Sequence, residues 1–229
     1  QENANLGGFI YWQEAVTPVS VFVFNDLSVP AQSYKGLPLT RYFPEPMGRM
    51  IAKTGWSSGR DSKDATVVMN IKTEIVTNHG HPDAGTFQIF YKGLVAPDLS
   101  HYNLIYPPNY PGHNTQTISH NGLLILDPNE YDYGTGYNSG GQKVITSPAG
   151  INFPTNIEDH ISRKDEFTTG EIIGMEYGPD KFFPVYSYIA GDITKAYSDK
   201  VSEVRRSMMF MPTENEEYPA VFFVMDKID

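Results

Sequence analysis

The sequence predicts an all-β protein, an antiparallel β-sandwich, from three observations. Short runs rich in Val, Ile, Phe, Tyr and Met recur along the 229 residues, and glycine, proline and asparagine separate them. Aromatic residues make up 13% of the chain, and their flat rings pack well on pleated sheets. Segments with helical periodicity are scarce. A chain of this length can form one large β domain or two small ones.

The elements are predicted in chain order from these runs and their punctuation. Residues 1–17 are predicted to be a short helix or the tail of a preceding domain, and residues 30–46 are rich in turn formers. The spacing of apolar residues in 199–206 does not decide whether that segment is helical. Two long loops, 102–115 and 130–141, are rich in Tyr, Asn, Gly and Pro. Strands are predicted at 19–24, 50–54, 65–72, 86–91, 123–126, 171–177, 185–189, 203–211 and 220–225.

Composition excludes several classes of function. The chain has no cysteine, so a bound metal must have His, Asp or Glu ligands. The formal net charge of −10 argues against nucleic acid as a partner. No apolar run reaches the roughly 18 residues that would cross a membrane. The chain begins at Gln1 without a signal-peptide pattern, and we expect it to be a piece of a longer protein or a processed one.

Positive charge is concentrated in one segment of this acidic chain. Only Glu45 and Asp61 oppose the basic residues of the segment 35–63. The segment either lines a site for an acidic ligand or carries scattered surface charge, and both interpretations remain open. The basic residues are Lys35, Arg41, Arg49, Lys53, Arg60 and Lys63.

A pair of histidines precedes one predicted strand. His79 and His81 are two residues apart, and in an extended chain residues i and i+2 point to the same side. Asp98 follows the strand 86–91, and His120 precedes another apolar run. Without cysteine, Zn²⁺ takes imidazole and carboxylate ligands, and His81, Asp98 and His120 would supply three. The alternative is that these are ordinary polar residues at strand ends.

An iron site is a second interpretation of the same segment. His81 and Asp83 form the H-x-D pattern of the two-histidine, one-carboxylate iron oxygenases. The later histidine would then be His120 or His160. Arg163 lies three residues after His160 and would bind the cosubstrate.

His79 and Asn78 suggest acid/base chemistry. A neutral imidazole is a good acid or base near pH 7, and an asparagine amide can donate a hydrogen bond to an oxyanion. The alternative for His79 is a structural histidine. Ser119, His120 and Asn121 have no nucleophile-elbow context, so acyl transfer is not expected.

Several stretches resemble the carboxyl-terminal β-sandwich of the heparinase II/III-like polysaccharide lyases. The most specific is the H-x-H-x-D-A-G-x-F-Q block that begins at His79, together with its spacing to His120-Asn121. Pro82 stands where the family often has leucine. The resemblance runs from about Arg41 to the end, which divides the chain into a connecting segment with the first strand or strands (1–40) and a β-sandwich domain (41–229). The supporting stretches are Arg49–Trp56, Thr117–Pro128, Tyr188–Tyr197 and Val204–Arg206.

This resemblance implies a function and a set of roles. The family combines an α/α toroid with a β-sandwich, and this chain resembles the sandwich without the toroid. The resemblance implies β-elimination on uronic-acid polysaccharides of the heparin or heparan sulfate kind, with His79 catalytic and Asn78 neutralising the uronate carboxylate. It also implies a structural Zn²⁺ bound by His81, Asp98 and His120. The implied partners are an acidic polysaccharide and an upstream toroid domain, the implied location is periplasmic or secreted, and the chain alone is expected to be inactive.

Overall fold

The computed structural model describes residues 33–57, 61–75, 80–99, 116–130, 140–143 and 154–229. The chain divides into two compact units, residues 1–38 and residues 39–229. The described residues of the first unit form a short 3₁₀ helix, η1 (Tyr34–Gly36). Its N-cap Ser33 accepts a hydrogen bond from the backbone N–H of Lys35 at 3.2 Å. The second unit contains the remaining described elements.

One sheet of the second unit is built from the amino-terminal part of this unit. Within the described residues it has five strands in the order β1-β2-β3-β4-β5, each antiparallel to its neighbours. The pairing of β4 with β5 shifts register between Ile89 and Phe90. The strands are β1 (Thr40–Phe43), β2 (Arg49–Lys53), β3 (Thr66–Asn70), β4 (Thr86–Phe90) and β5 (Leu94–Ala96).

The other sheet is built from the carboxyl-terminal part. In the described chain it has four antiparallel strands in the order β6-β7-β8-β9, so that each strand pairs with the next in sequence. Connections between sequence neighbours are short, which favours this meander. The strands are β6 (Glu171–Gly178), β7 (Tyr186–Asp192), β8 (Val204–Pro212) and β9 (Ala220–Ile228).

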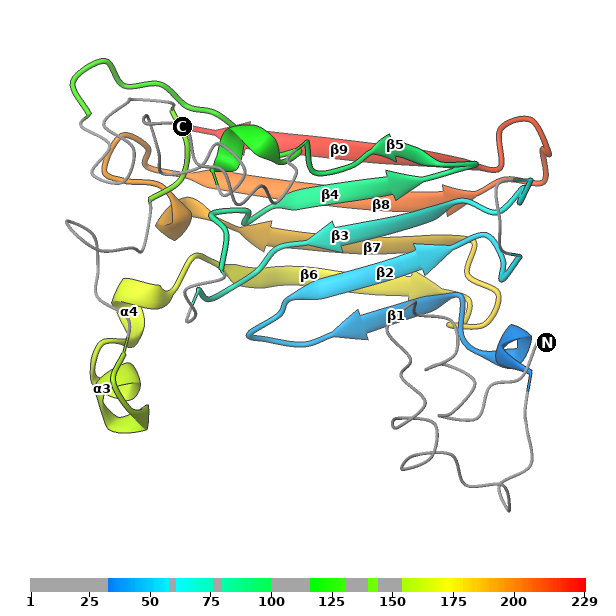
Figure 1. Ribbon diagram of the computed structural model, residues 1–229, viewed down its shortest axis with the longest axis horizontal. Helices are drawn as coiled ribbons and strands as arrows, with labels where there is room; N and C mark the ends of the chain where they lie inside the picture. The colour runs from blue at the N-terminus through cyan, green and yellow to red at the C-terminus, as the bar shows by residue number, and fades with distance from the viewer. Residues whose placement is uncertain (1–32, 58–60, 76–79, 100–115, 131–139, 144–153) are drawn as a thin grey trace, which may run out of the picture. The chain divides into compact units, whose positions relative to one another are not determined.

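The hydrophobic core lies between the two sheets, which Figure 1 shows face to face. Val67 and Met69 of β3 are fully buried, whereas Val68 between them is only partly buried. The same alternation places Ile189 of β7 and Met208 of β8 in the core. A strand sends alternate side chains to opposite faces, so each sheet contributes one apolar face. The predicted fold class, an all-β antiparallel sandwich, is confirmed.

The helices of the described residues are short segments outside the strands. Asn156 caps α3 (Ile157–Ser162), because its side chain accepts a hydrogen bond from the Asp159 N–H at 2.8 Å. Among the described residues, no helix is both long and apolar enough to cross a membrane. The other short helices are α4 (Lys164–Phe167), η3 (Thr117–Ser119) and η4 (Thr194–Ala196).

Several predicted elements differ from the structure. The strand predicted at 123–126 is wrong, because these residues form no strand. A helix at 199–206 is excluded, since β8 begins at Val204. Strands β1 and β5 were not predicted, because β1 lies in the turn-rich segment and β5 has only three residues. The strand predicted at 19–24 lies outside the described residues.

Candidate metal centre

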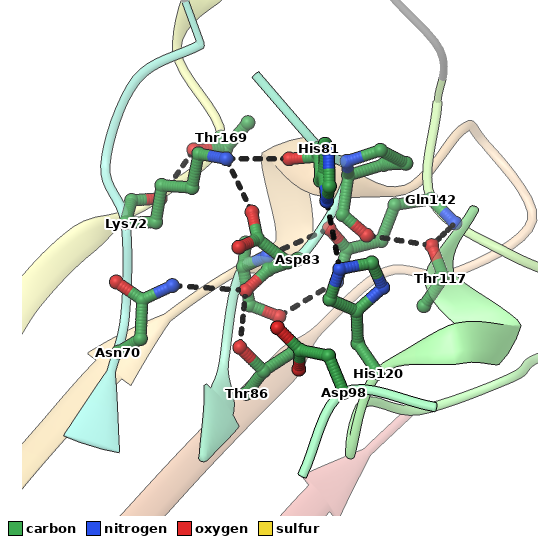
Figure 2. A network of polar contacts seen from close by, with 12 residues as sticks. Asn70, Lys72, His81, Asp83, Thr86, Asp98, Thr117, His120, Gln142 and Thr169 are labelled. Carbon is green, nitrogen blue, oxygen red and sulfur yellow. Dashed lines mark hydrogen bonds and ion pairs between the residues drawn. The ribbon is translucent and has the colours of Figure 1, made fainter. Parts of the chain in front are cut away.

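His81 lies in the connection between β3 and β4, and hydrogen bonds attach this connection to both strands. The backbone carbonyl of Asp83 accepts from Thr86 Oγ1 at 2.8 Å and from Asn70 Nδ2 at 3.3 Å. Asn70 and Thr86 are cross-strand partners in the register of β3 and β4. The two strand ends therefore hold the turn that follows His81, as Figure 2 shows.

Lys72 fastens the same connection from the other side. It leaves β3 in the left-handed region, with φ of 54°, a conformation that is unfavourable for a residue with a Cβ. From there its ammonium group donates to the His81 carbonyl at 2.5 Å and forms an ion pair with the Asp83 carboxylate. Both side chains of this pair are largely buried. These bonds offset the backbone strain and orient the residues on either side of Pro82.

His120 comes from a second connection, at the end of η3. The hydroxyl of Thr117 donates to the carbonyl of Pro82 at 2.8 Å and accepts from the N–H of Gln142 at 2.9 Å. Asn121 donates from Nδ2 to the carbonyl of Phe87 on β4 at 3.0 Å. Hydrogen bonds thus join this connection directly to the one that carries His81.

The two histidine rings meet. Nδ1 of His81 lies 3.0 Å from Nε2 of His120, and the rings are 5.1 Å apart at an angle of 76° (Figure 2). Two nitrogens that share one tetrahedral Zn²⁺, each about 2.0–2.1 Å from it, lie about 3.4 Å apart. The observed distance suits a hydrogen bond between the rings, and a small movement would suit a shared ion.

The second nitrogen of His120 fixes its tautomer. Nδ1 lies 2.8 Å from the carbonyl of Gln116, and a carbonyl can only accept, so Nδ1 carries the proton. The lone pair of Nε2 therefore points toward His81. A metal-binding histidine usually donates its other N–H to a carbonyl or carboxylate in this manner.

The surroundings of His81 favour its neutral form. Burial lowers the pKa of this imidazole below its usual 6.5, and the neighbouring His120 ring lowers it further. The carboxylates of Asp83 and Asp98 act in the opposite direction. A neutral imidazole is the form that binds a metal ion.

Asp98, the third predicted ligand, is engaged elsewhere. Its Oδ2 accepts a hydrogen bond from Nε2 of Gln88 on β4 at 2.6 Å. In the part of the chain that the structure describes, no group of three His, Asp or Glu side chains is close enough to hold an ion. The structure thus brings His81 and His120 together, and Asp98 lies near enough to influence the pKa of His81.

The residues that would form the iron-oxygenase site make other contacts in the structure. Asp83 forms an ion pair with Lys72, and His160 lies in α3 with its Nε2 3.4 Å from the carboxylate of Glu74. The guanidinium of Arg163 pairs with Asp159 and Glu166 in its own helical segment. Asn78 and His79, the predicted catalytic pair, lie outside the described residues.

Arg206 also contributes to the site, although its sequence context did not single it out. Its Nη1 donates to the carbonyls of Gly85 at 2.7 Å and Asn121 at 3.1 Å, so one side chain binds both connections of the site. The sequence pair Arg205-Arg206 within a predicted strand could have indicated an inward-facing arginine. Because neighbours in a strand point to opposite faces, one of the two arginines has to face the core.

Comparison with protein-family models and with curated proteins finds no match to this chain.

Proposed function

We propose that this chain is the β-sandwich domain of a lyase that cleaves uronic-acid polysaccharides by β-elimination. One observation carries the proposal: the imidazoles of His81 and His120, 39 positions apart in sequence, meet at 3.0 Å. In this proposal His81, His120 and Asp98 bind a structural Zn²⁺, and Asp98 leaves Gln88 to do so. The ion would join the two connections and so fix the segment just before His81.

The catalytic step is assigned to His79 and Asn78. In β-elimination a base removes the proton at C5 of a uronate, a C4=C5 double bond forms, and the bond from C4 to the glycosidic oxygen breaks while a general acid protonates that oxygen. The proton is weakly acidic while the adjacent carboxylate is charged. Hydrogen bonds from Asn78 and His79 to that carboxylate would stabilise the enolate-like intermediate as charge develops. Anchoring at His81 matters because small displacements of a catalytic group reduce the rate strongly.

The remaining groups and the location follow from the resemblance. The base and the rest of the cleft would come from an α/α toroid encoded upstream, so the isolated chain is proposed to be inactive. A polysaccharide substrate is large and lies outside the cytoplasm, which places the complete enzyme in the periplasm or among secreted proteins.

Metal content tests the zinc part of the proposal. The chain, purified and dialysed against zinc-free buffer, is expected to retain close to one Zn²⁺ per molecule by elemental analysis. His81→Ala and Asp98→Asn are expected to lose it, and His160→Ala, which removes an imidazole outside the site, is expected to retain it. Absence of zinc from the unsubstituted chain, or retention in Asp98→Asn, contradicts the zinc site.

Activity tests the lyase part. The chain joined to its natural upstream segment is expected to release unsaturated uronate products from an acidic polysaccharide, seen as ultraviolet absorbance, and the chain alone is not. His79→Ala is expected to abolish product release without loss of zinc. If zinc is bound and His79→Ala has full activity, the domain is a structural or carbohydrate-binding zinc sandwich instead.

A further inference from the structure

Three cations lie together on the outer face of the first sheet, the face turned away from the second sheet. Met50 of β2 is fully buried, so its neighbours Arg49 and Ile51 point to the outer face, and Lys53 follows two residues later. Arg41 of β1 is the cross-strand partner of Ile51 and faces the same side. Arg49 and Lys53 are about 13 Å apart along the strand. We call Arg41, Arg49 and Lys53 the basic strip.

The basic strip has polar but no acidic partners among the residues that the structure describes. Arg49 donates from Nε to Asn70 Oδ1 at 3.4 Å, and Lys53 donates to Thr66 Oγ1 at 3.0 Å. Among the described residues, no carboxylate lies within ion-pairing distance of the three cations. Many other cations of the chain do pair with carboxylates, namely Lys63, Lys72, Lys164, Lys195, Lys200, Arg205, Arg206 and Lys227. Unpaired cations that neighbour one another on an acidic protein favour an anionic ligand.

Aromatic rings accompany these cations. The ammonium of Lys53 lies 4.9 Å from the centre of the Trp56 ring, and the guanidinium of Arg41 lies 5.8 Å from that of Phe43. Burial lowers the pKa of Lys53, against the opposing effect of Asp64. A flat ring offers an apolar face to the C–H face of a sugar, and an adjacent cation pairs with a carboxylate on the same sugar.

A chain of hydrogen bonds connects the basic strip to the candidate metal centre. Arg49 contacts the side-chain oxygen of Asn70, and the amide nitrogen of Asn70 donates to the carbonyl of Asp83 at 3.3 Å. Asp83 is two residues from His81. Gln88, on the same outer face of β4, donates to Asp98. Hydrogen bonds therefore link the strip to the segment next to His81, and Asp98 contacts the same outer face through Gln88.

We propose that the basic strip binds a carboxylated polysaccharide and directs it toward the His81 side of the sheet. This deepens the proposed function and depends on it for the nature of the ligand. Uronates spaced along the polymer would pair with Arg49 and Lys53, and Trp56 would pack against a sugar ring. A nucleic acid is disfavoured because the net charge of −10 repels a dense polyanion, whereas a sparsely carboxylated glycan needs few cations.

Binding to the 229-residue chain tests the proposal without any need for activity. The probe is a fluorescent hexasaccharide of alternating uronic acid and amino sugar without sulfate, followed by anisotropy at low and moderate salt. Each of Arg41→Gln, Arg49→Gln and Lys53→Gln is expected to weaken binding about three-fold, and the triple variant about thirty-fold. The matched control carries Lys195→Gln, Arg205→Gln and Lys227→Gln, which remove the same charge elsewhere and are expected to leave affinity within about two-fold.

Three results would overturn the proposal: no binding by the unsubstituted chain, equal loss in the strip and control triples, or tighter binding of a single-stranded DNA of equal charge. A carboxyl-reduced hexasaccharide is expected not to bind. Zinc content and melting temperature are measured on the same samples. If the strip triple weakens binding but the chain holds no zinc, the metal centre is rejected and the strip proposal stands. If the chain holds zinc but the strip and control triples lose affinity equally, the strip proposal alone is rejected.

Discussion

The guanidinium of Arg206 forms four hydrogen bonds near the candidate site. It is 5% exposed and forms a two-point ion pair with Asp226 of β9, at 2.6 and 2.8 Å. Its remaining hydrogen bonds go to the carbonyls of Gly85 and Asn121. Removing a buried cation with this many hydrogen bonds destabilises the fold, because the groups that it bonded are left buried and unpaired.

Replacing Arg206 should therefore be costly. Arg206→Met is expected to lower the free energy of unfolding by about 3–5 kcal/mol, because Asp226 and two buried carbonyls lose their partner. The measurement is urea unfolding followed by circular dichroism. Arg205→Met, half exposed on the opposite face of β8, should cost no more than about 1 kcal/mol. The double variant Arg206→Met with Asp226→Leu should recover part of the loss, and equal effects of the two single changes would contradict this account.

Tyr197 gives the fold an alkaline pH dependence. Its hydroxyl is buried and donates to the carbonyl of Leu123 at 2.8 Å, and burial raises its pKa above the ordinary value of 10.0. A raised folded-state pKa gives stability that is complete below 10.0 and lost as the pH rises through the folded-state pKa. Tyr197→Phe should cost about 1 kcal/mol at about pH 8 and progressively less above about pH 10. A cost that does not change between these pH values in urea unfolding would contradict the assignment.

Gly191 allows the two sheets to pack closely at one point. Gly191 of β7 faces the core, and a Cβ there would lie 2.3 Å from Cγ2 of Ile71, which follows β3. The absence of a side chain lets the first sheet approach the second at the place where the connection to His81 begins. The strands themselves were predictable from alternation, and the predictions at 65–72 and 185–189 lie on β3 and β7. Their close approach could not be predicted, because nothing local in either strand specifies its partner across the core.

Filling this space should strain the sandwich. Gly191→Ala is expected to lower the free energy of unfolding by about 1–3 kcal/mol through overpacking. Gly191→Ala with Ile71→Leu removes the Cγ2 methyl that clashes while nearly conserving volume, and it should recover part of the loss. The control is Gly36→Ala, where no atom lies within 4 Å of the added Cβ. Thermal unfolding of the four proteins checks the order, and a Gly191→Ala variant as stable as the control would refute it.

Across the molecule, the sandwich assembles a site from segments that are remote in sequence. His81 belongs to the connection between β3 and β4, His120 to the end of η3, and Arg206 to the opposite sheet. An ion held between such segments stabilises the whole fold, because the unfolded chain cannot hold it in the same geometry.

If the proposed zinc site is correct, removing the ion should lower the melting temperature. With free Zn²⁺ at about 1,000 times its dissociation constant, binding adds about 4 kcal/mol, or roughly 10 °C for a chain of this size. A scanning calorimeter should record this decrease after treatment with a chelator and its reversal by added Zn²⁺. The variant with His81→Ala and His120→Ala should respond to neither. An unsubstituted chain that melts at the same temperature with and without chelator would disprove the metal centre.

The pattern along the chain was enough for the fold class and for most strands, since the alternation of buried and exposed residues is a local property of the backbone. It also singled out His81, Asp98 and His120 as residues for one site. The pattern did not predict the short elements β1, β5 and α3, because they have too few residues to show a period.

Contacts across the core could not be predicted from the local pattern of residues. The meeting of His81 with His120, the inward direction of Arg206 rather than Arg205, and the pairing of Asp98 with Gln88 all follow from how two sheets and their connections pack. These distances depend on residues tens of positions apart. Buried polar groups that the sheets do not satisfy need hydrogen-bond partners, and only the packing of the sheets brings a given side chain within reach of them.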